Sequence, residues 1–172
     1  MTQEPKAIVS AILIRKGSDG IEIFLQTRWK PAISPTYSGM VEIPAGGIDA
    51  YENVYDALKR EVREECGLTV TRVVNDYRGP IKNTLDQEQA FVFKPFICQQ
   101  ALQTKDGLPW IGFVFLCEVR GEVKINPAEA KNPRWVSAEQ LRAILETTPH
   151  QIFPLQLPVL RYFLENLDQI SF

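Results

Sequence analysis

The sequence has few cysteines, no membrane-length apolar run and no basic tract, and each absence excludes a class of protein. The three cysteines are odd in number and form no Cys-x-x-Cys pair, so we expect buried free thiols in a reducing compartment. No apolar run approaches the ~20 residues that span a bilayer, and no signal or transit peptide is apparent, which predicts a cytoplasmic protein. With a net charge of −2 and no basic tract, binding to nucleic acid or to an anionic membrane is not expected.

Histidine is nearly absent as well. The single one, His150, has no partner at metal-ligand spacing, and no Ser-His-Asp set is visible, so any hydrolysis should use water as the nucleophile. At 172 residues, with 45% hydrophobic and 23% charged residues, the chain has the length and composition of one globular domain, which we expect to span residues 1–172.

The order of apolar runs and turn signals predicts a mixture of strands and helices without regular alternation. This order argues against a doubly wound parallel sheet and favours a mixed sheet with helices on both faces. The expected strands are Ala7–Lys16, Ile21–Thr27, Val41–Ile43, Leu68–Tyr77, Ala90–Gln99, Ile111–Val119, Glu122–Ile125 and Arg134–Val136, and the expected helices are Glu52–Cys66, a segment from Ser137 to about Glu146, and Phe153–Leu167.

Both ends of the first helix carry sequence signals. Asp49 precedes Glu52 by three residues, a capping-box arrangement that predicts the helix start. Gly67 is placed to end the helix. Immediately before it, Ala45-Gly46-Gly47 predicts a tight loop, and the polar segment Asn126–Pro133 predicts a second loop later in the chain.

Acidic residues occupy the apolar side of this helix. At about 100° per residue, Glu61 and Glu65 fall within the apolar arc, and Glu64 lies on its edge. Glutamate is almost never fully buried unless paired, and carboxylates three and four residues apart repel one another. A positive group must therefore lie beside them, and oxygen ligands favour Mg²⁺, or Mn²⁺ in its place. The apolar arc consists of Val54, Ala57, Leu58, Val62 and Cys66, and the opposite, solvent side carries Asp56, Lys59, Arg60 and Arg63.

The segment Gly46–Leu68 resembles the Nudix box. Gly46 is followed after five residues by Glu52 and, after seven more, by Arg60-Glu61-Val62-Arg63-Glu64-Glu65-Cys66-Gly67-Leu68, so that every defined position of the box is filled. The resemblance implies an α/β (α+β) protein with a Nudix-like α/β/α sandwich and a mixed β-sheet. It also implies a divalent-cation-dependent hydrolase that cleaves a nucleoside diphosphate linked to another group.

The resemblance assigns a metal site to the box. Its glutamates, here Glu61, Glu64 and Glu65, would hold the divalent cation, in agreement with the sidedness of the helix. In the family the loop beside the box glycine can offer a backbone carbonyl to the metal, which here would come from Ala45 or Gly46. Small residues allow the close backbone approach that this requires.

The other implied roles concern orientation and proton transfer. Glu52 and Arg60 would form an orienting pair, and Arg60 precedes Glu64 by one turn, so it could also steady that ligand. The general base is left open by the sequence. The candidates are Glu64, Glu129 in the Asn126–Pro133 loop, and Glu88, with Glu129 preferred to Glu88 because other members carry a loop carboxylate there.

The substrate is the least determined feature. Glu42-Ile43-Pro44-Ala45-Gly46 resembles the Glu-x-Pro-Ala-Gly run of ADP-ribose pyrophosphatases and sugar-nucleotide hydrolases, although Pro80 follows the box sooner than the corresponding proline of ADP-ribose members. Aromatic residues that could stack on a base or sugar, and cations that could hold phosphates, are more simply explained as packing and surface charge. They are Trp29, Tyr37 and Trp110, and Arg28, Lys30, Arg78 and Lys82.

Other readings of the same box remain open. A nucleoside triphosphate pyrophosphatase of the same family and a non-catalytic nucleotide-sensing module are the alternatives, although degenerate sensing modules usually lose box carboxylates and this box is complete. An isopentenyl-diphosphate-isomerase-like enzyme would need a catalytic cysteine and a different glutamate set. Family members often form homodimers, but no interface can be recognised in the sequence.

Overall fold

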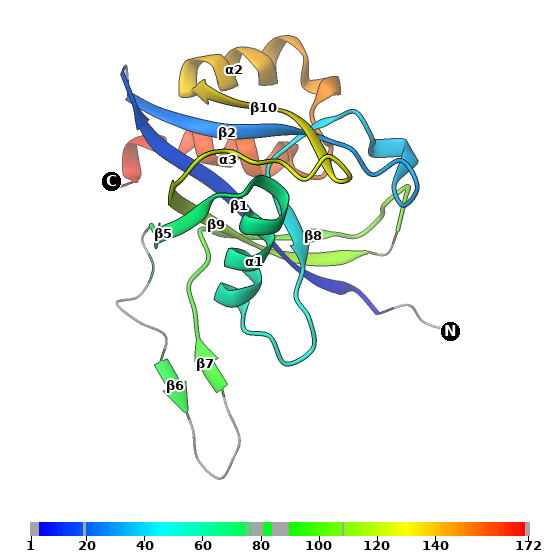
Figure 1. The fold of residues 1–172 in the computed structure, drawn as a ribbon, viewed down its shortest axis with the longest axis vertical. Helices are drawn as coiled ribbons and strands as arrows, with labels where there is room; N and C mark the ends of the chain where they lie inside the picture. The colour runs from blue at the N-terminus through cyan, green and yellow to red at the C-terminus, as the bar shows by residue number, and fades with distance from the viewer. Residues whose placement is uncertain are drawn as a thin grey trace.

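The computed structural model describes residues 4–18, 20–74, 76, 81–83, 90–107 and 109–170, with backbone alone at residues 81–83 and 91. The strands and helices follow one another along the chain as Figure 1 shows. The strands are β1 (Lys6–Gly17), β2 (Gly20–Arg28), β3 (Val41–Glu42), β4 (Ala45–Gly47), β5 (Thr69–Val73), β6 (Ile81–Asn83), β7 (Ala90–Val92), β8 (Ile97–Ala101), β9 (Trp110–Arg120) and β10 (Ala130–Ser137). The α-helices are α1 (Val54–Cys66), α2 (Ala138–Thr147) and α3 (Leu157–Glu165), and the 3₁₀ helices are η1 (Pro35–Tyr37), η2 (Pro149–Gln151) and η3 (Leu167–Gln169).

Eight of these strands form one mixed sheet. Its central path runs β10-β2-β1-β9-β5, with β3 paired to β2, β4 to β1, and β8 to β9. β1 and β9 pair in parallel, and the other ladders of this sheet are antiparallel. β6 and β7 form a separate two-stranded ladder that projects away from the sheet (Figure 1).

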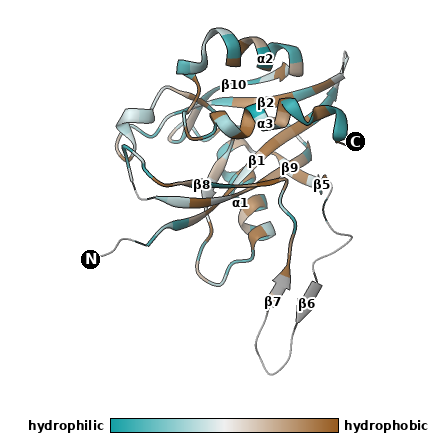
Figure 2. Ribbon diagram, turned by 180° about the vertical axis from the view of Figure 1, so that it is seen from behind, coloured by the Kyte–Doolittle hydropathy of each residue, from teal (hydrophilic) through white to brown (hydrophobic). Residues whose placement is uncertain are grey.

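Apolar side chains of the central strands point alternately to the two faces of the sheet, so a hydrophobic core forms on each face. In β1, Val9 and Leu13 point to one face, whereas Ile12 and Ile14 point to the other. The first face is covered by α1 and the second by α2 and α3. Hydrophobic colour accordingly concentrates in the central strands and on one side of the helices (Figure 2). The predicted α/β/α sandwich with a mixed sheet is confirmed.

The opening between β1 and β2 positions the segment that precedes α1. β1 and β2 pair only near their turn, from Ile14↔Ile23 to Gly17↔Gly20, and then separate. The gap is filled by residues 41–47, whose first half pairs with β2 and whose second half pairs with β1. Pro44 lies at the crossover, where its carbonyl accepts a hydrogen bond from the Ala11 amide at 2.9 Å. Ala45-Gly46-Gly47, expected to form a tight loop, therefore forms the short strand β4, which is fixed in the sheet beside α1.

Several element boundaries differ from those expected. Helix α1 begins at Val54 and is capped by Asn53, whose side-chain oxygen accepts hydrogen bonds from two backbone amides, so Asp49 is not the N-cap. The Ala90–Gln99 segment forms two strands, β7 and β8, instead of one. Glu122–Ile125 forms no strand, and β10 begins within the expected Asn126–Pro133 loop because a bulge between Lys131 and Arg134 accommodates Pro133.

The cysteines follow the prediction in two of three cases. Cys66 and Cys117 are buried free thiols, and burial raises the pKa of Cys66 to about 12. Cys98 is exposed, contrary to the expectation, because β8 lies at the edge of the sheet and alternate side chains point outward. Within the described part of the chain, no helix has the length and apolarity needed to cross a bilayer.

Candidate active site

The flank of α1 that faces Ala45 and Gly46 of β4 carries the buried carboxylates. Glu65 is 1% exposed and Glu61 is 13% exposed, whereas Glu64, on the edge of this flank, is 55% exposed. The apolar arc expected from the sequence is buried against the sheet, and Gly67 ends the helix in the left-handed conformation with φ = 71°. The side on which each glutamate lies is therefore as predicted.

Gly46 is in van der Waals contact with the Glu61 side chain. A Cβ atom at this position would overlap the Glu61 carboxylate, whereas a Cβ at Gly47 would meet nothing within 4 Å. One turn further along α1, an oxygen of Glu65 accepts a hydrogen bond from the Ala45 amide at 3.3 Å. Gly46 and Ala45 thus contact Glu61 and Glu65, two of the predicted metal ligands, which are one helical turn apart.

Arg60 organises the outer part of this site. Its Nε and Nη2 donate to the two oxygens of Glu52 at 2.9 and 2.7 Å, a bidentate pair, and Nη2 also donates to the Gly47 carbonyl at 2.9 Å. Its Nη1 donates to Glu61 at 2.6 Å and reaches Glu64 at 3.4 Å. The expected Glu52–Arg60 pair is present. The assignment of Arg60 to the solvent side is wrong in one respect, because its long side chain folds back to the carboxylates.

The Glu52 carboxylate is held in a turn before α1. The Asp49 amide donates to it at 3.1 Å, and the Glu52 amide donates to the Asp49 carbonyl at 3.1 Å. Hydrogen bonding from Arg60, with the Asp49 amide assisting, lowers the pKa of Glu52 to about 2. The expected capping box therefore acts as a turn that presents Glu52 to Arg60.

Acid is expected to weaken the folded protein partly through Glu52. Because its pKa in the folded state lies below the ordinary value of 4.5, its contribution to the free energy of unfolding is present above about pH 4.5 and is lost as the pH falls toward 2. The free energy of unfolding, measured with urea, should therefore fall more across this pH range for the wild type than for Glu52→Gln. Glu165→Gln, an exposed change on α3, is the control, and equal pH slopes in wild type and Glu52→Gln would contradict the prediction.

Glu65 is surrounded by donors from three elements. One oxygen accepts from Gln26 Nε2 of β2 at 2.8 Å and from the Ala45 amide, and the other accepts from Lys30 Nζ at 3.0 Å. Burial raises the pKa of Glu65 and outweighs the opposite effect of Lys30 and Gln26. The pKa of Glu61 is likewise raised by burial, against Arg60.

Lys30 joins Glu65 to Glu129. Its Nζ lies 2.9 Å from a Glu129 oxygen, and the Trp29 amide donates to the Glu129 carbonyl at 2.7 Å. Burial lowers the pKa of Lys30, but the two carboxylates raise it more, so the net shift is upward. Antiparallel pairing of β2 with β10, with Ala130 opposite Arg28, brings Glu129 to this position. The preferred loop carboxylate therefore lies at the site, 64 residues beyond Glu65 in the chain (129 − 65).

Sequence reasoning missed another buried carboxylate near Glu65, that of Glu42. Glu42 is 2% exposed and accepts from Arg28 at 3.1 Å. Burial and the neighbouring Glu65 carboxylate raise the pKa of Glu42 to about 7, against the lowering effect of Arg28. Glu42 Oε1, Arg28 Nε and Gln26 Oε1 are buried without a hydrogen-bond partner among the described residues. Polar residues within apolar strands, as in Leu25-Gln26 and Val41-Glu42-Ile43, were the signal available in the sequence.

The positive groups beside the buried carboxylates are side chains of the protein itself. Sequence reasoning required a cation there and took it to be a metal, whereas Arg60 pairs with Glu61 and Lys30 pairs with Glu65. Across the described residues, no three carboxylate, histidine or cysteine side chains are close enough to hold an ion as they stand. The donor chemistry nevertheless suits a hard divalent cation, because Glu61 and Glu65 lie beside β4, where Gly46 leaves no side chain in the way.

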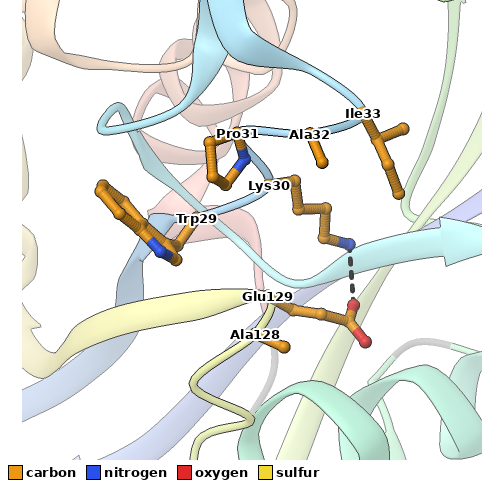
Figure 3. Close-up of a pocket in the computed structure, with 7 residues that line it drawn as sticks. All are labelled: Trp29, Lys30, Pro31, Ala32, Ile33, Ala128 and Glu129. Carbon is orange, nitrogen blue, oxygen red and sulfur yellow. Dashed lines mark ion pairs between the residues drawn. The ribbon is translucent and has the colours of Figure 1, made fainter.

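A pocket of about 480 Å³ opens beside the Lys30–Glu129 pair. Figure 3 shows Lys30 pointing to Glu129, with the apolar side chains of Trp29, Pro31, Ala32 and Ile33 around the lysine. Lys131 of β10 lies over the Trp29 ring, with Nζ 3.1 Å from its centroid. The pocket is lined by Trp29, Lys30, Pro31, Ala32, Ile33, Ala128 and Glu129.

The other predicted contact residues are distributed differently. Tyr37 is buried and packs edge-on against Phe153, which supports the packing explanation. Arg28 is engaged with Glu42, so it is not a simple surface charge. Arg78 and Glu88 lie outside the described residues, and the side chain of Lys82 does as well. His150 is exposed in η2, as expected for a surface residue.

The fold and this helix-loop arrangement define the class of protein. An α/β/α sandwich that presents acidic residues of one helix to a glycine loop is the architecture implied by the box. The NUDIX domain model matches residues 4–156, most of the chain, and no curated protein sequence matches at a significant level. The chain therefore belongs to the Nudix family and is a Nudix hydrolase, as the sequence predicts.

Solved structures share the fold at low sequence identity. A NUDIX-family hydrolase from Clostridium perfringens is 22% identical, with 96% of this chain and 99% of that chain covered and a TM-score of 0.64. The NUDIX domain of Shewanella oneidensis NrtR, solved with ADP ribose, is 14% identical, with coverages of 96% and 90% and a TM-score of 0.64. An Ap4A hydrolase from C. elegans is 17% identical, with coverages of 95% and 98% and a TM-score of 0.55.

Proposed function

We propose that this chain is a divalent-cation-dependent pyrophosphohydrolase that cleaves the diphosphate linkage of a nucleoside diphosphate derivative. The observation that carries the proposal is the contact of Glu61 and Glu65, on one flank of α1, with Gly46 and Ala45 of β4. Two carboxylates lie there beside the half-buried backbone of Ala45 and Gly46, and a hard cation can neutralise their charge. Mg²⁺ is the expected ion, with Mn²⁺ as a substitute.

The proposed ligands are Glu61, Glu64 and Glu65, with a carbonyl of Ala45 or Gly46. When bound, the ion supplies positive charge to the diphosphate oxygens and lowers the pKa of the attacking water. Arg60, braced by Glu52, keeps Glu61 and Glu64 oriented through its bonds to both. Positioning and electrostatics then account for most of what the protein must contribute to phosphoryl chemistry.

Glu129 is the preferred general base. Its carboxylate is 34% exposed, so water can reach it. The Lys30 ammonium contacts both this carboxylate and that of Glu65. Asn126 Nδ2 donates to the other Glu129 oxygen at 3.0 Å and holds the Glu129 carboxylate in orientation. Glu64, itself one of the proposed ligands, is the alternative base, because it is exposed and lies on the edge of the flank that carries Glu61 and Glu65.

ADP-ribose or a sugar nucleotide is the favoured substrate type. Support comes from the Glu42–Gly46 run, whose Glu42 is buried near Glu65, and from the pocket that Glu129 lines. A structural neighbour was solved with ADP ribose, and another is an Ap4A hydrolase, so related folds accept adenine nucleotides of different kinds.

Trp29 is proposed to bind the nucleoside part of the substrate within the pocket. Trp29→Ala is expected to raise KM about tenfold with little change in kcat, since stacking of one base on an aromatic ring contributes about 1–3 kcal/mol. Trp29→Phe keeps an aromatic face and should retain most of the affinity. Steady-state kinetics checks this, and an unchanged KM in Trp29→Ala would place the nucleoside elsewhere.

A substrate panel with Mg²⁺ or Mn²⁺ tests the function as a whole. ADP-ribose, sugar nucleotides, nucleoside triphosphates including oxidised ones, and dinucleoside polyphosphates are incubated with the protein, and phosphate products are resolved by chromatography. Cleavage of ADP-ribose or a sugar nucleotide into two phosphate monoesters is the expected result. Preference for triphosphates would support the triphosphate pyrophosphatase, and nucleotide binding without any cleavage would support the sensing module.

A further inference from the structure

Lys30 occupies the place of a cation between two carboxylates that come from different parts of the chain. Its Nζ lies 3.0 Å from Glu65 Oε1 and 2.9 Å from Glu129 Oε2, and its side chain is 17% exposed. The second Glu65 oxygen is already engaged by Gln26 and by the Ala45 amide. Oε1 of Glu65 is therefore the oxygen to which another cation would have to bind, and Lys30 holds it.

The backbone of Lys30 is fixed, but its side chain has another place to go. The Lys30 carbonyl accepts hydrogen bonds from the Ser34 and Ile33 amides at 2.8 and 3.2 Å, which forms a tight turn after β2. The side chain, however, lines the pocket as well as contacting the two carboxylates. Figure 3 shows it running along the pocket wall to Glu129. A rotation about its flexible stem can remove the ammonium from Glu65 without any backbone movement.

We propose that Lys30 is a positioning residue that substitutes for the divalent cation in the metal-free protein and must release Glu65 when the cation binds. In the metal-free protein, Lys30 holds Glu65 and Glu129 together and removes the cost of a buried unpaired carboxylate. The same ion pair competes with the incoming cation for Glu65 Oε1. This inference rests on the proposed function, because it takes Glu65 as a metal ligand.

The competition predicts opposite signs for two measurements on the protein without substrate. Lys30→Met should lower the melting temperature in chelator, because Glu65 loses its ionic partner. The same variant should bind Mn²⁺ about tenfold more tightly, or more, in calorimetry, which is the equivalent of one close charge pair. A purely structural role for Lys30 would lower the melting temperature and weaken Mn²⁺ binding. Lys30→Gln, which can still donate to Glu65, gives a second uncharged variant with the same expected tightening if Lys30→Met folds poorly.

Lys131→Met is the matched control for charge. Lys131 is on β10, stacks on Trp29 and has the same charge, but among the described residues it forms no ion pair with Glu65 or Glu129. This variant should change Mn²⁺ affinity much less than Lys30→Met. If both variants tighten Mn²⁺ binding equally, the general loss of positive charge explains the effect and the role of Lys30 is wrong.

Glu65→Gln separates this inference from the proposed function. If Glu65→Gln leaves Mn²⁺ binding unchanged, Glu65 is not a ligand, and both the site assignment and the role of Lys30 are overturned. If Glu65→Gln weakens Mn²⁺ binding but Lys30→Met and Lys30→Gln bind Mn²⁺ no more tightly than wild type, the site assignment stands and only the role of Lys30 is overturned.

Discussion

Glu64→Gln and Glu65→Gln are each expected to reduce metal-dependent turnover by about 10³-fold or more. A metal ion contributes several kcal/mol of charge stabilisation in the transition state, and each 1.36 kcal/mol corresponds to a factor of ten in rate. Each substitution removes one negative charge from the proposed ligand set and keeps the shape of the side chain. Initial rates at saturating Mg²⁺ on the best substrate of the panel measure the effect.

The two variants should differ in stability, which separates loss of catalysis from loss of fold. Glu64 is mostly exposed, so the free energy of unfolding of Glu64→Gln should lie within about 1 kcal/mol of the wild-type value. Glu65 is buried against Lys30 and Gln26, so Glu65→Gln should change the stability of the chelator-treated protein more than Glu64→Gln does. Lys30 keeps Glu129 as its ion-pair partner in this variant. Glu165→Gln on α3 lies on the other face of the sheet and should be fully active. Near wild-type rates in both Glu64→Gln and Glu65→Gln would remove the site assignment.

Gly46→Ala is expected to lose both activity and stability. Its new Cβ atom would overlap the Glu61 carboxylate, so either β4 or α1 must shift. Forcing an extra methyl group into a close contact costs about 1–3 kcal/mol of unfolding free energy. A displaced Glu61 is also a misplaced ligand, so turnover should fall by about 100-fold, the loss that a small misplacement near the chemistry can cause. Thermal melting and initial rates on the same preparations test both effects.

The chain contains its own control for this substitution. Gly47 is the next residue in the same strand, its φ is not positive, and a Cβ there would meet nothing within 4 Å, so Gly47→Ala should retain activity and stability. The double variant Gly46→Ala, Glu61→Ala should recover stability, because the overlapping carboxylate is gone, but not activity. A Gly46→Ala protein that is as stable and active as Gly47→Ala would show that the close approach of this loop to α1 is not required.

The sequence by itself determined the parts of this protein that depend on local spacing. The 3.6-residue period of α1 set which side of the helix Glu61 and Glu65 occupy, and Gly67 set where the helix ends. The Arg60–Glu52 pair was also recognisable, because both residues belong to one short motif. The helix start was misplaced because Asp49 and Asn53 are both competent caps, and only the hydrogen bonds distinguish them.

Only the tertiary structure decided what surrounds the carboxylates. Lys30 and Gln26 reach Glu65 from β2 and the turn after it, and Glu129 reaches Lys30 because β10 pairs with β2. Glu42 comes near Glu65 because β3 fills the gap where β2 separates from β1. Sequence periodicity shows that a carboxylate faces inward but contains no information on which distant side chain compensates it, since strand register across the sheet sets that partner. For this reason the sequence required a positive charge beside Glu65 and assigned it to a metal, whereas the fold placed Lys30 there.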